Sequence, residues 1–160
     1  MKRILTLLFL VGLSYNMQAQ KCDYTINEKG QKKIMVTLSN QMQIWLNNES
    51  GAFSLGFELT YPDIKKEKIL KGDTLVLVVG ESEYVNLVAR EEAPPVGKAD
   101  ETVEITNYFP IYDLPAPVAE KLSRMPITAI KMYFGKDFNL IELEPKKAKK
   151  IIEAAGCVRQ

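Results

Sequence analysis

The sequence predicts an α+β protein that is mainly antiparallel β: a β-sandwich or a curved sheet with one short helix and a C-terminal helix. Short apolar segments with period-two alternation, separated by turn residues, recur through most of the 160 residues. Helical patterns occur only after residue 113, in a short segment and again at the C-terminus. The spacing rules leave the choice between a sandwich and a curved sheet open.

The clearest strand pattern lies between residues 42 and 61. From Phe53 to Tyr61 every second residue is apolar, which is typical of a half-buried antiparallel strand. The preceding strand alternates in the same way, and the sequence NNESG between the two supplies a turn. A hairpin is therefore predicted, with Trp45 on the side of its strand opposite the apolar residues.

The other strands are predicted from similar signals. Thr74–Val79 is a continuous apolar run and is the candidate for a central strand buried on both faces. Residues 84–89 follow a turn and complete a second hairpin, and residues 91–101, with two prolines and five charges, are predicted to be the longest loop. Further strands are expected at 23–27, 34–38, 102–109, 127–134 and 138–143.

Two helices are predicted. Asp113 is expected to cap the first, two prolines fall in its opening turn, and Pro126 prevents its continuation. The second helix begins at Pro145 and has apolar residues at helical spacing. Gly156 is expected to end it, because glycine readily adopts the left-handed conformation of a helix C-cap.

The N-terminus has the features of an export signal. Lys2 and Arg3 precede the apolar run Ile4–Leu13, and a polar stretch ends at Ala19. We therefore predict a signal peptide at 1–20, a single β-rich domain at 21–160, and a periplasmic or extracellular location. The alternative is a buried N-terminal helix. The apolar run is too short to span a bilayer, which takes roughly 20 residues, so no transmembrane anchor is expected.

The chain has two cysteines, Cys22 and Cys157, at opposite ends of the predicted domain. In an exported protein this placement predicts a disulfide, which would stabilise the fold by about 5 kcal/mol in the chain-entropy model. Two unpaired buried thiols are the alternative. A lipid anchor is disfavoured, because Lys21 stands where a small residue is needed.

Three segments resemble a known group. The stretches KCDYTINE near residue 21, ITAIKMYF at 127–134 and KKAKKIIEAAGCV near the C-terminus are similar to small exported proteins of Bacteroidota. The resemblance covers both ends of the domain and leaves most of the middle unmatched. It implies export and is compatible with a disulfide, but it implies no activity and no catalytic residue.

The sequence contains no pattern typical of an enzyme. It has no histidine, so the usual base of serine and cysteine nucleophiles is missing, and it has no glycine-rich phosphate loop. We predict no catalytic residue, no metal site and no cofactor. Carboxylates at turns, such as Glu81, Glu83, Asp100 and Glu101, leave a carboxylate-dependent hydrolase as the alternative, although acids at turns are usually only solvated.

Two sets of residues are candidates for binding. Lys146, Lys147, Lys149 and Lys150 form the densest charge cluster, and lysines at a helix N-terminus oppose the helix dipole. They suggest an anionic glycan or lipid headgroup, although a solvated helix face is the favoured interpretation, because lysines on an exposed helix face usually serve solubility. Aromatic rings are the second set, because Trp45, Tyr108 and Tyr112 could stack on sugars. For Trp45 the favoured expectation is instead that a second packed sheet buries it.

The leading hypothesis is a non-catalytic exported module that binds a protein or a glycan. The alternatives are a hydrolase of cell-wall or dietary polysaccharide, and an envelope protein held on anionic surfaces by its basic helix. With 21 basic and 20 acidic residues the chain is almost neutral, which gives no reason to expect nucleic acid as a partner. Two acids facing each other in a cleft would favour the hydrolase.

Overall fold

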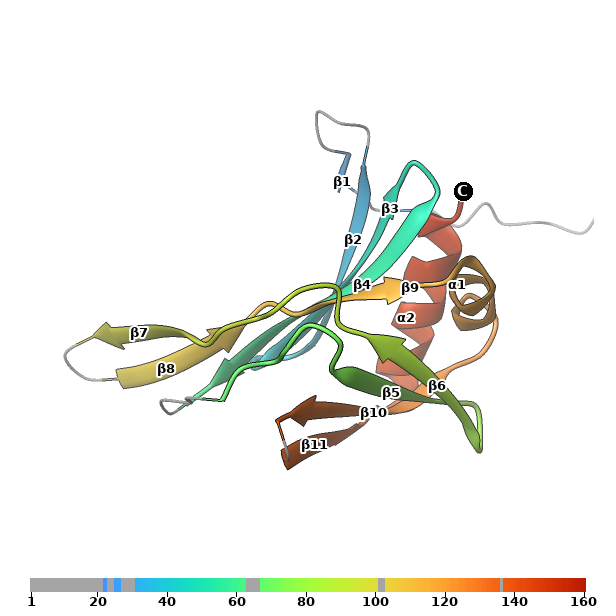
Figure 1. The fold of residues 1–160 in the computed structure, drawn as a ribbon. Helices are drawn as coiled ribbons and strands as arrows, with labels where there is room; N and C mark the ends of the chain where they lie inside the picture. Colours follow the sequence, from blue (N-terminus) through green and yellow to red (C-terminus); the bar gives the residue numbers. More distant parts are fainter. Residues whose placement is uncertain (1–21, 23–24, 27–30, 63–66, 101–102, 136) are drawn as a thin grey trace, which may run out of the picture.

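The structure is a computed structural model that describes residues 22, 25–26, 31–62, 67–100, 103–135 and 137–160. The predicted signal peptide lies outside the described residues. The described chain forms two antiparallel sheets and two helices, which confirms the predicted fold class and resolves its arrangement as sandwich-like (Figure 1).

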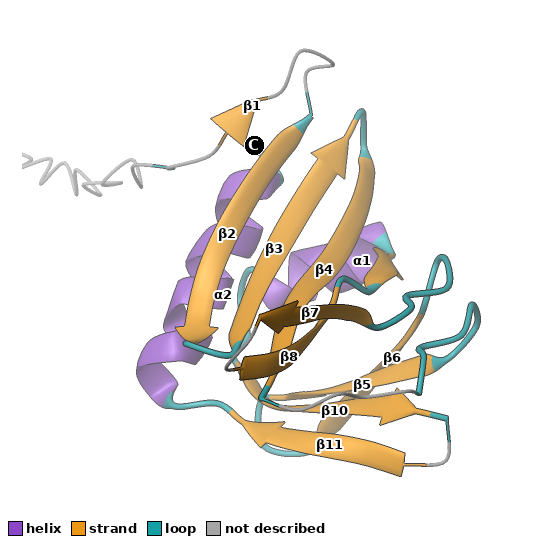
Figure 2. Ribbon diagram, turned by 90° about the vertical axis from the view of Figure 1, so that its left-hand side faces the viewer, coloured by secondary structure: helices purple, strands orange, loops and turns teal. Residues whose placement is uncertain are grey.

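The larger sheet has the order β1-β2-β3-β4-β8-β7, and β9 also pairs with β4. The smaller sheet has the order β11-β10-β5-β6. In Figure 2 the strands of the smaller sheet run across the direction of β2, β3 and β4. The larger sheet comprises β1 Thr25–Ile26, β2 Lys32–Ser39, β3 Met42–Glu49, β4 Ala52–Tyr61, β7 Val96–Asp100, β8 Val103–Tyr108 and β9 Ile111–Leu114. The smaller sheet comprises β5 Thr74–Val79, β6 Glu83–Val88, β10 Ile127–Phe134 and β11 Asp137–Glu142.

Two helices complete the fold. α2 (Pro145–Val158) packs on β2 and β3 and also contacts β10 and α1 (Ala116–Leu122), as Figures 1 and 2 show. The inward faces of both sheets meet the apolar side of α2 in one core, where Phe57, Leu77 and Ile151 are fully buried. Burying these faces is the main source of stability, at roughly 25 cal/mol per Å² of apolar surface.

The hairpin predicted at 42–61 is confirmed as β3 and β4. The strands extend further than the sequence suggested, and only Ser50 and Gly51 form the turn, with φ angles of 51° and 94°. Positive φ at both central residues is the geometry that matches the twist of a two-residue hairpin. Asn48 supports the turn, because its side-chain oxygen accepts a hydrogen bond of 2.8 Å from the Gly51 N–H.

Four predictions about local structure need correction. Asp113 does not cap α1. It belongs to β9, and its carboxylate accepts a hydrogen bond of 2.7 Å from Arg90, while Pro115 occupies the cap. α2 does not end at Gly156 but continues to Val158, because Cys157 and Val158 are buried against the core. That burial exceeds the cost of a helical glycine, about 1 kcal/mol.

The remaining two corrections concern β7 and β5. Residues 91–101 are not one long loop, because β7 pairs with β8 as a hairpin, and Ala93 forms a bridge to Ile69. β5 is central in its sheet, as predicted, but only one of its faces is fully buried: Leu75 and Leu77 are inside, while Val76 faces outward and is half-buried. The smaller sheet is therefore covered on one side by the rest of the described chain.

The disulfide between Cys22 and Cys157 is confirmed, with an S–S distance of 2.03 Å. It links the chain just before β1 to the last turn of α2. A second contact lies nearby, where the Asn48 side-chain amide donates a hydrogen bond of 2.9 Å to the carbonyl of Val158. The C-terminal end of α2 is therefore attached to the larger sheet both covalently and through a part-buried hydrogen bond.

Candidate functional site

The structure places the three predicted aromatic residues in different surroundings, and none is an exposed platform. Tyr108 and Tyr112 are 1% and 0% exposed and belong to the core. Tyr112 packs edge-to-face on Phe57, and its hydroxyl has no hydrogen-bond partner in the described part of the chain. Burial, together with the negative charge of Asp73, raises the pKa of Tyr112 above its ordinary value.

Trp45 is 7% exposed, but it is not covered by a second sheet. It lies on the outer face of the larger sheet, and its indole rests on Gly56, the directly opposite residue of β4. The smaller sheet packs on the other face, where Ile44 and Leu46 point. The expectation that a second sheet buries Trp45 is therefore wrong, because residues of its own sheet bury the indole.

The four lysines of α2 lie apart from these aromatic residues. Lys146, Lys149 and Lys150 are exposed and Lys147 is half-buried. Lys149 approaches Glu153, one helical turn away, at 4.0 Å. None of the four lines the cleft between the two sheets or the hollow on the outer face of the larger sheet.

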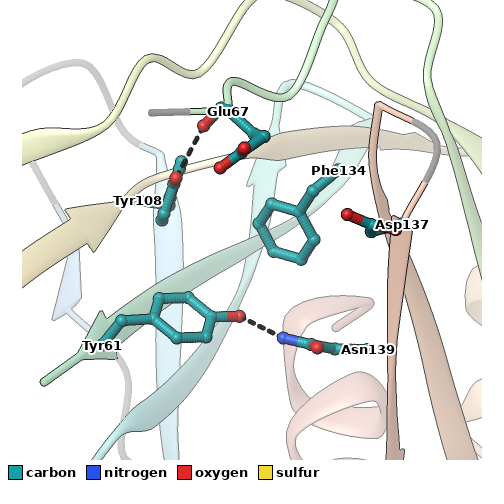
Figure 3. Close-up of a pocket in the computed structure, with 6 residues that line it drawn as sticks. All are labelled: Tyr61, Glu67, Tyr108, Phe134, Asp137 and Asn139. Atoms are coloured by element: carbon teal, nitrogen blue, oxygen red, sulfur yellow. Dashed lines mark hydrogen bonds between the residues drawn. The ribbon is translucent and has the colours of Figure 1, made fainter. Parts of the chain in front are cut away.

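A cleft of about 220 Å³ opens between the two sheets (Figure 3). One side is formed by the end of β4 and by β8, the other by the end of β10 and by β11. Glu67, in the segment before β5, completes the rim. We call this hollow the inter-sheet cleft; its lining residues are Tyr61, Glu67, Tyr108, Phe134, Asp137 and Asn139.

Three aromatic rings form the apolar part of the inter-sheet cleft. Tyr61, Tyr108 and Phe134 contact one another edge-to-face, with ring centroids separated by 5.4 to 6.0 Å. This geometry brings the positive edge of one ring to the negative face of the next and stabilises the cluster. Tyr108 is buried and supports the other two rings, which are half-buried and reach the cleft.

Hydrogen bonds hold the two tyrosines in place. The Tyr108 hydroxyl donates to the carbonyl of Glu67 at 2.6 Å, and the Asn139 amide donates to the Tyr61 hydroxyl oxygen at 2.6 Å (Figure 3). The second bond crosses from the smaller sheet to the larger one. The side chains of Glu67 and Asp137 are exposed at the rim, so carboxylate oxygens and ring surface lie around the same opening.

The register of β11 explains why polar groups face this cleft. Asp137 pairs with Phe134 and Asn139 pairs with Met132, so both share the inward side of the sheet. The alternate residues, Phe138 and Leu140, point outward and are 51% and 56% exposed. The first four residues of β11 thus have polar side chains inside and apolar ones outside, the reverse of the usual pattern, whereas Ile141 points inward and packs against the core.

Of the residues that line the inter-sheet cleft, only Tyr108 was among the predicted site residues. The alternation of Asp137 and Asn139 with Phe138 and Leu140 was a signal, because polar residues on an inward face are typical of a site. This signal could not be interpreted from the sequence, because the inward face of β11 is known only from its pairing with β10. Tyr61 was placed correctly on the apolar face of its strand, but its contact with Asn139 joins residues that are distant in the sequence and was not predictable from either strand alone.

Comparison of the chain with protein-family models, with curated proteins and with solved structures finds no match. The resemblance to exported Bacteroidota proteins therefore stays a prediction. Within the described residues, no cluster of three or more acidic or sulfur side chains is arranged to hold a metal ion. No helix among the described residues has the length and apolarity needed to cross a membrane.

Proposed function

We propose that the protein is an exported, non-catalytic module that binds a short glycan in the inter-sheet cleft. The observation that carries the proposal is the combination of Tyr61 and Phe134 rings with the side chains of Asn139, Asp137 and Glu67 around one opening. Ligand sites typically combine apolar and aromatic walls with a few polar groups that fix orientation.

The chemistry of the cleft suits a sugar. A sugar ring has an apolar C–H face, which packs on an aromatic ring, and hydroxyl groups, which need acceptors and donors at its edge. Carboxylates supply acceptors only, and the Asn139 amide supplies both kinds of group. Because Tyr61 and Phe134 are held edge-to-face with Tyr108, a ligand meets rings that are already ordered, which lowers the entropic cost of binding.

The disulfide supports the exported location. Disulfides persist in oxidising compartments and are rare in the cytosol, where thiols are kept reduced. Cys157 is almost fully buried and its bond to Cys22 joins distant parts of the chain, which is the arrangement of a structural disulfide.

One observation favours the hydrolase alternative: Glu67 and Asp137 line the same cleft. A general acid acting near neutral pH must be kept protonated, which enzymes achieve by burial or by a close negative charge. Both side chains are exposed, so neither has the buried environment that the general acid requires. The geometry supports binding better than hydrolysis.

The proposal is tested by measuring glycan binding to the mature, oxidised protein on an array, followed by calorimetric titration of each hit. Asn139→Ala and Asp137→Asn are expected to weaken binding by roughly tenfold each, since each removes a hydrogen bond or a charge from the rim. Asn86→Ala is the matched control, because Asn86 is exposed on the outward face of the smaller sheet. Equal loss in the control variant would contradict the proposed location.

The same hits distinguish the two functions. Each bound glycan is incubated with the wild-type protein and with Glu67→Gln and Asp137→Asn variants, and release of new reducing ends is measured. The binding proposal expects no release from any of the three proteins. Release by the wild type that either variant abolishes would establish the hydrolase instead.

A further inference from the structure

A second hollow, of about 540 Å³, lies on the outer face of the larger sheet. It is bounded by β1 on one side and by Ile111 of β9 on the other, and Lys33, Trp45 and Asn47 form its centre. The register places Lys33 opposite Asn47 and places Trp45 opposite Gly56 on the same face. We call it the outer hollow. It is separate from the inter-sheet cleft, because the two open on opposite faces of the larger sheet and share no lining residue.

Both faces of the Trp45 indole are occupied. On one side the ring lies so close to Gly56 that an added Cβ would be 2.1 Å from its Cε2 atom. On the other side the Lys33 ammonium lies 4.6 Å from the ring centroid, a cation–π contact. A ligand therefore reaches the edge of the indole and not its face. The indole N–H lies over Gly56 and donates to none of the described residues.

The outer hollow contains the positive charge of Lys33. Within the described residues, the Lys33 ammonium forms no ion pair. Asp113 lies on the same face, but Arg90 already holds its carboxylate at 2.7 Å. Glu58 lies on the same face one pair of residues beyond Gly56, and it does not line the hollow. An ammonium and an indole N–H, both donors only, therefore lie side by side.

We propose that the outer hollow binds the carboxylate of an acidic sugar, such as a uronic acid. Ammonium–carboxylate hydrogen bonds are among the stronger polar contacts in proteins, and the indole N–H supplies a second donor. The amide of Asn47 at the centre of the hollow is suited to the hydroxyl groups of a sugar ring. The Thr25 hydroxyl at the wall donates to the Lys33 carbonyl at 3.3 Å, and its oxygen can still accept a hydrogen bond. This site is distinct from the one in the proposed function and does not depend on it.

Trp45 is the only tryptophan of the chain, so its fluorescence reports on this site alone. The mature, oxidised protein is titrated with galacturonic acid oligomers, with neutral galactose oligomers of the same length, and with a short peptide carrying a free C-terminal carboxylate. Saturable change with the acidic sugar only is expected. Equal response to the neutral sugar, response to the peptide alone, or no response to any of the three would overturn the proposal.

Two variants test whether binding of the acidic oligomer depends on the charge of Lys33 in particular or only on the net charge of the protein. Lys33→Gln is expected to weaken binding of the acidic oligomer roughly tenfold or more, because it removes the charged partner of the carboxylate. Lys32→Gln is the matched control, since Lys32 is the adjacent residue of β2 and points to the opposite face. An equal loss in both variants, or no loss in Lys33→Gln, would overturn the assignment. Thermal unfolding confirms that both variants are folded.

Discussion

The two hollows lie on opposite faces of the larger sheet and differ in charge and in construction. The inter-sheet cleft has the carboxylates of Glu67 and Asp137 at its rim and is built across two sheets. The outer hollow has the Lys33 ammonium at its centre and is built on one sheet, with β1 as a wall. The inter-sheet cleft is therefore supported by the core, whereas one wall of the outer hollow is a strand of only two residues.

This contrast concerns stability as well as ligands. β1 has only two residues, both exposed, and it pairs with β2 alone. Because β1 buries little surface, we expect its position to depend on the nearby disulfide of Cys22. The rings of the inter-sheet cleft, in contrast, pack against buried residues of both sheets. We expect changes near β1 to affect the outer hollow and to leave the cleft intact.

The largest effect is expected from removing the disulfide with the double variant Cys22→Ala and Cys157→Ala. The free energy of unfolding should fall by roughly 2–5 kcal/mol, because the unfolded chain loses a long covalent loop. Urea titration measures this loss. Binding at the outer hollow should weaken more than binding at the inter-sheet cleft. An unchanged free energy of unfolding would contradict the role assigned to the bond.

Gly56→Ala should affect the outer hollow next most strongly. The new Cβ would lie 2.1 Å from the Trp45 ring, so the indole must move, at a cost of about 1–3 kcal/mol. A red shift of Trp45 fluorescence and loss of acidic-sugar binding are expected. Gly97→Ala is the control, because nothing lies within 4 Å of its added Cβ. Similar destabilisation of both variants would show that Trp45 is not held by Gly56.

Tyr112 predicts a response to alkaline pH. Its pKa is raised by burial, so the unfolded chain releases the proton near pH 10 while the folded chain retains it. The contribution of the protonated Tyr112 hydroxyl to the free energy of unfolding is therefore intact below about pH 10. Above that pH it falls by about 1.4 kcal/mol per pH unit until the hydroxyl titrates in the folded protein as well. Unfolding of Tyr112→Phe measured over this range should show a shallower decline, and an identical decline would contradict the prediction.

Tyr108→Phe should cost about 1 kcal/mol, because it leaves the carbonyl of Glu67 without the hydroxyl that now bonds it. The matched change Tyr112→Phe removes a buried hydroxyl with no partner in the described residues, so at neutral pH it should be neutral or slightly stabilising. Urea titration of the two variants compares them directly. The opposite ranking would show that the two hydroxyls have been assigned incorrectly.

Much of the fold was predictable from local pattern. The apolar alternation of 53–61 determines the inward face of β4, and the apolar run of 74–79 marks β5. The predicted start of α1 and the predicted end of α2 were wrong, because tertiary contacts override the local signals there. Arg90, distant in the sequence, holds Asp113 in β9 and away from the helix cap, and core burial carries α2 past Gly156.

The candidate sites were less predictable for the same reason. Trp45 was identified as notable from its place on the outer face, but the sequence did not show that Gly56 would lie beneath it. Phe134, Asp137 and Asn139 were taken only as parts of a strand, a turn and a strand. Their grouping with Tyr61 depends on how the two sheets approach each other.

The mainly antiparallel architecture and the inward face of most strands follow from the amino-acid sequence alone, because period-two alternation is a local property of the chain. The two cysteines predicted a disulfide in the same way, and the structure confirms it. Where the two hollows open, and which charges they contain, depends instead on tertiary packing. The physical reason is that a hollow is formed by side chains from separate elements, and their distances are set by packing of the whole core.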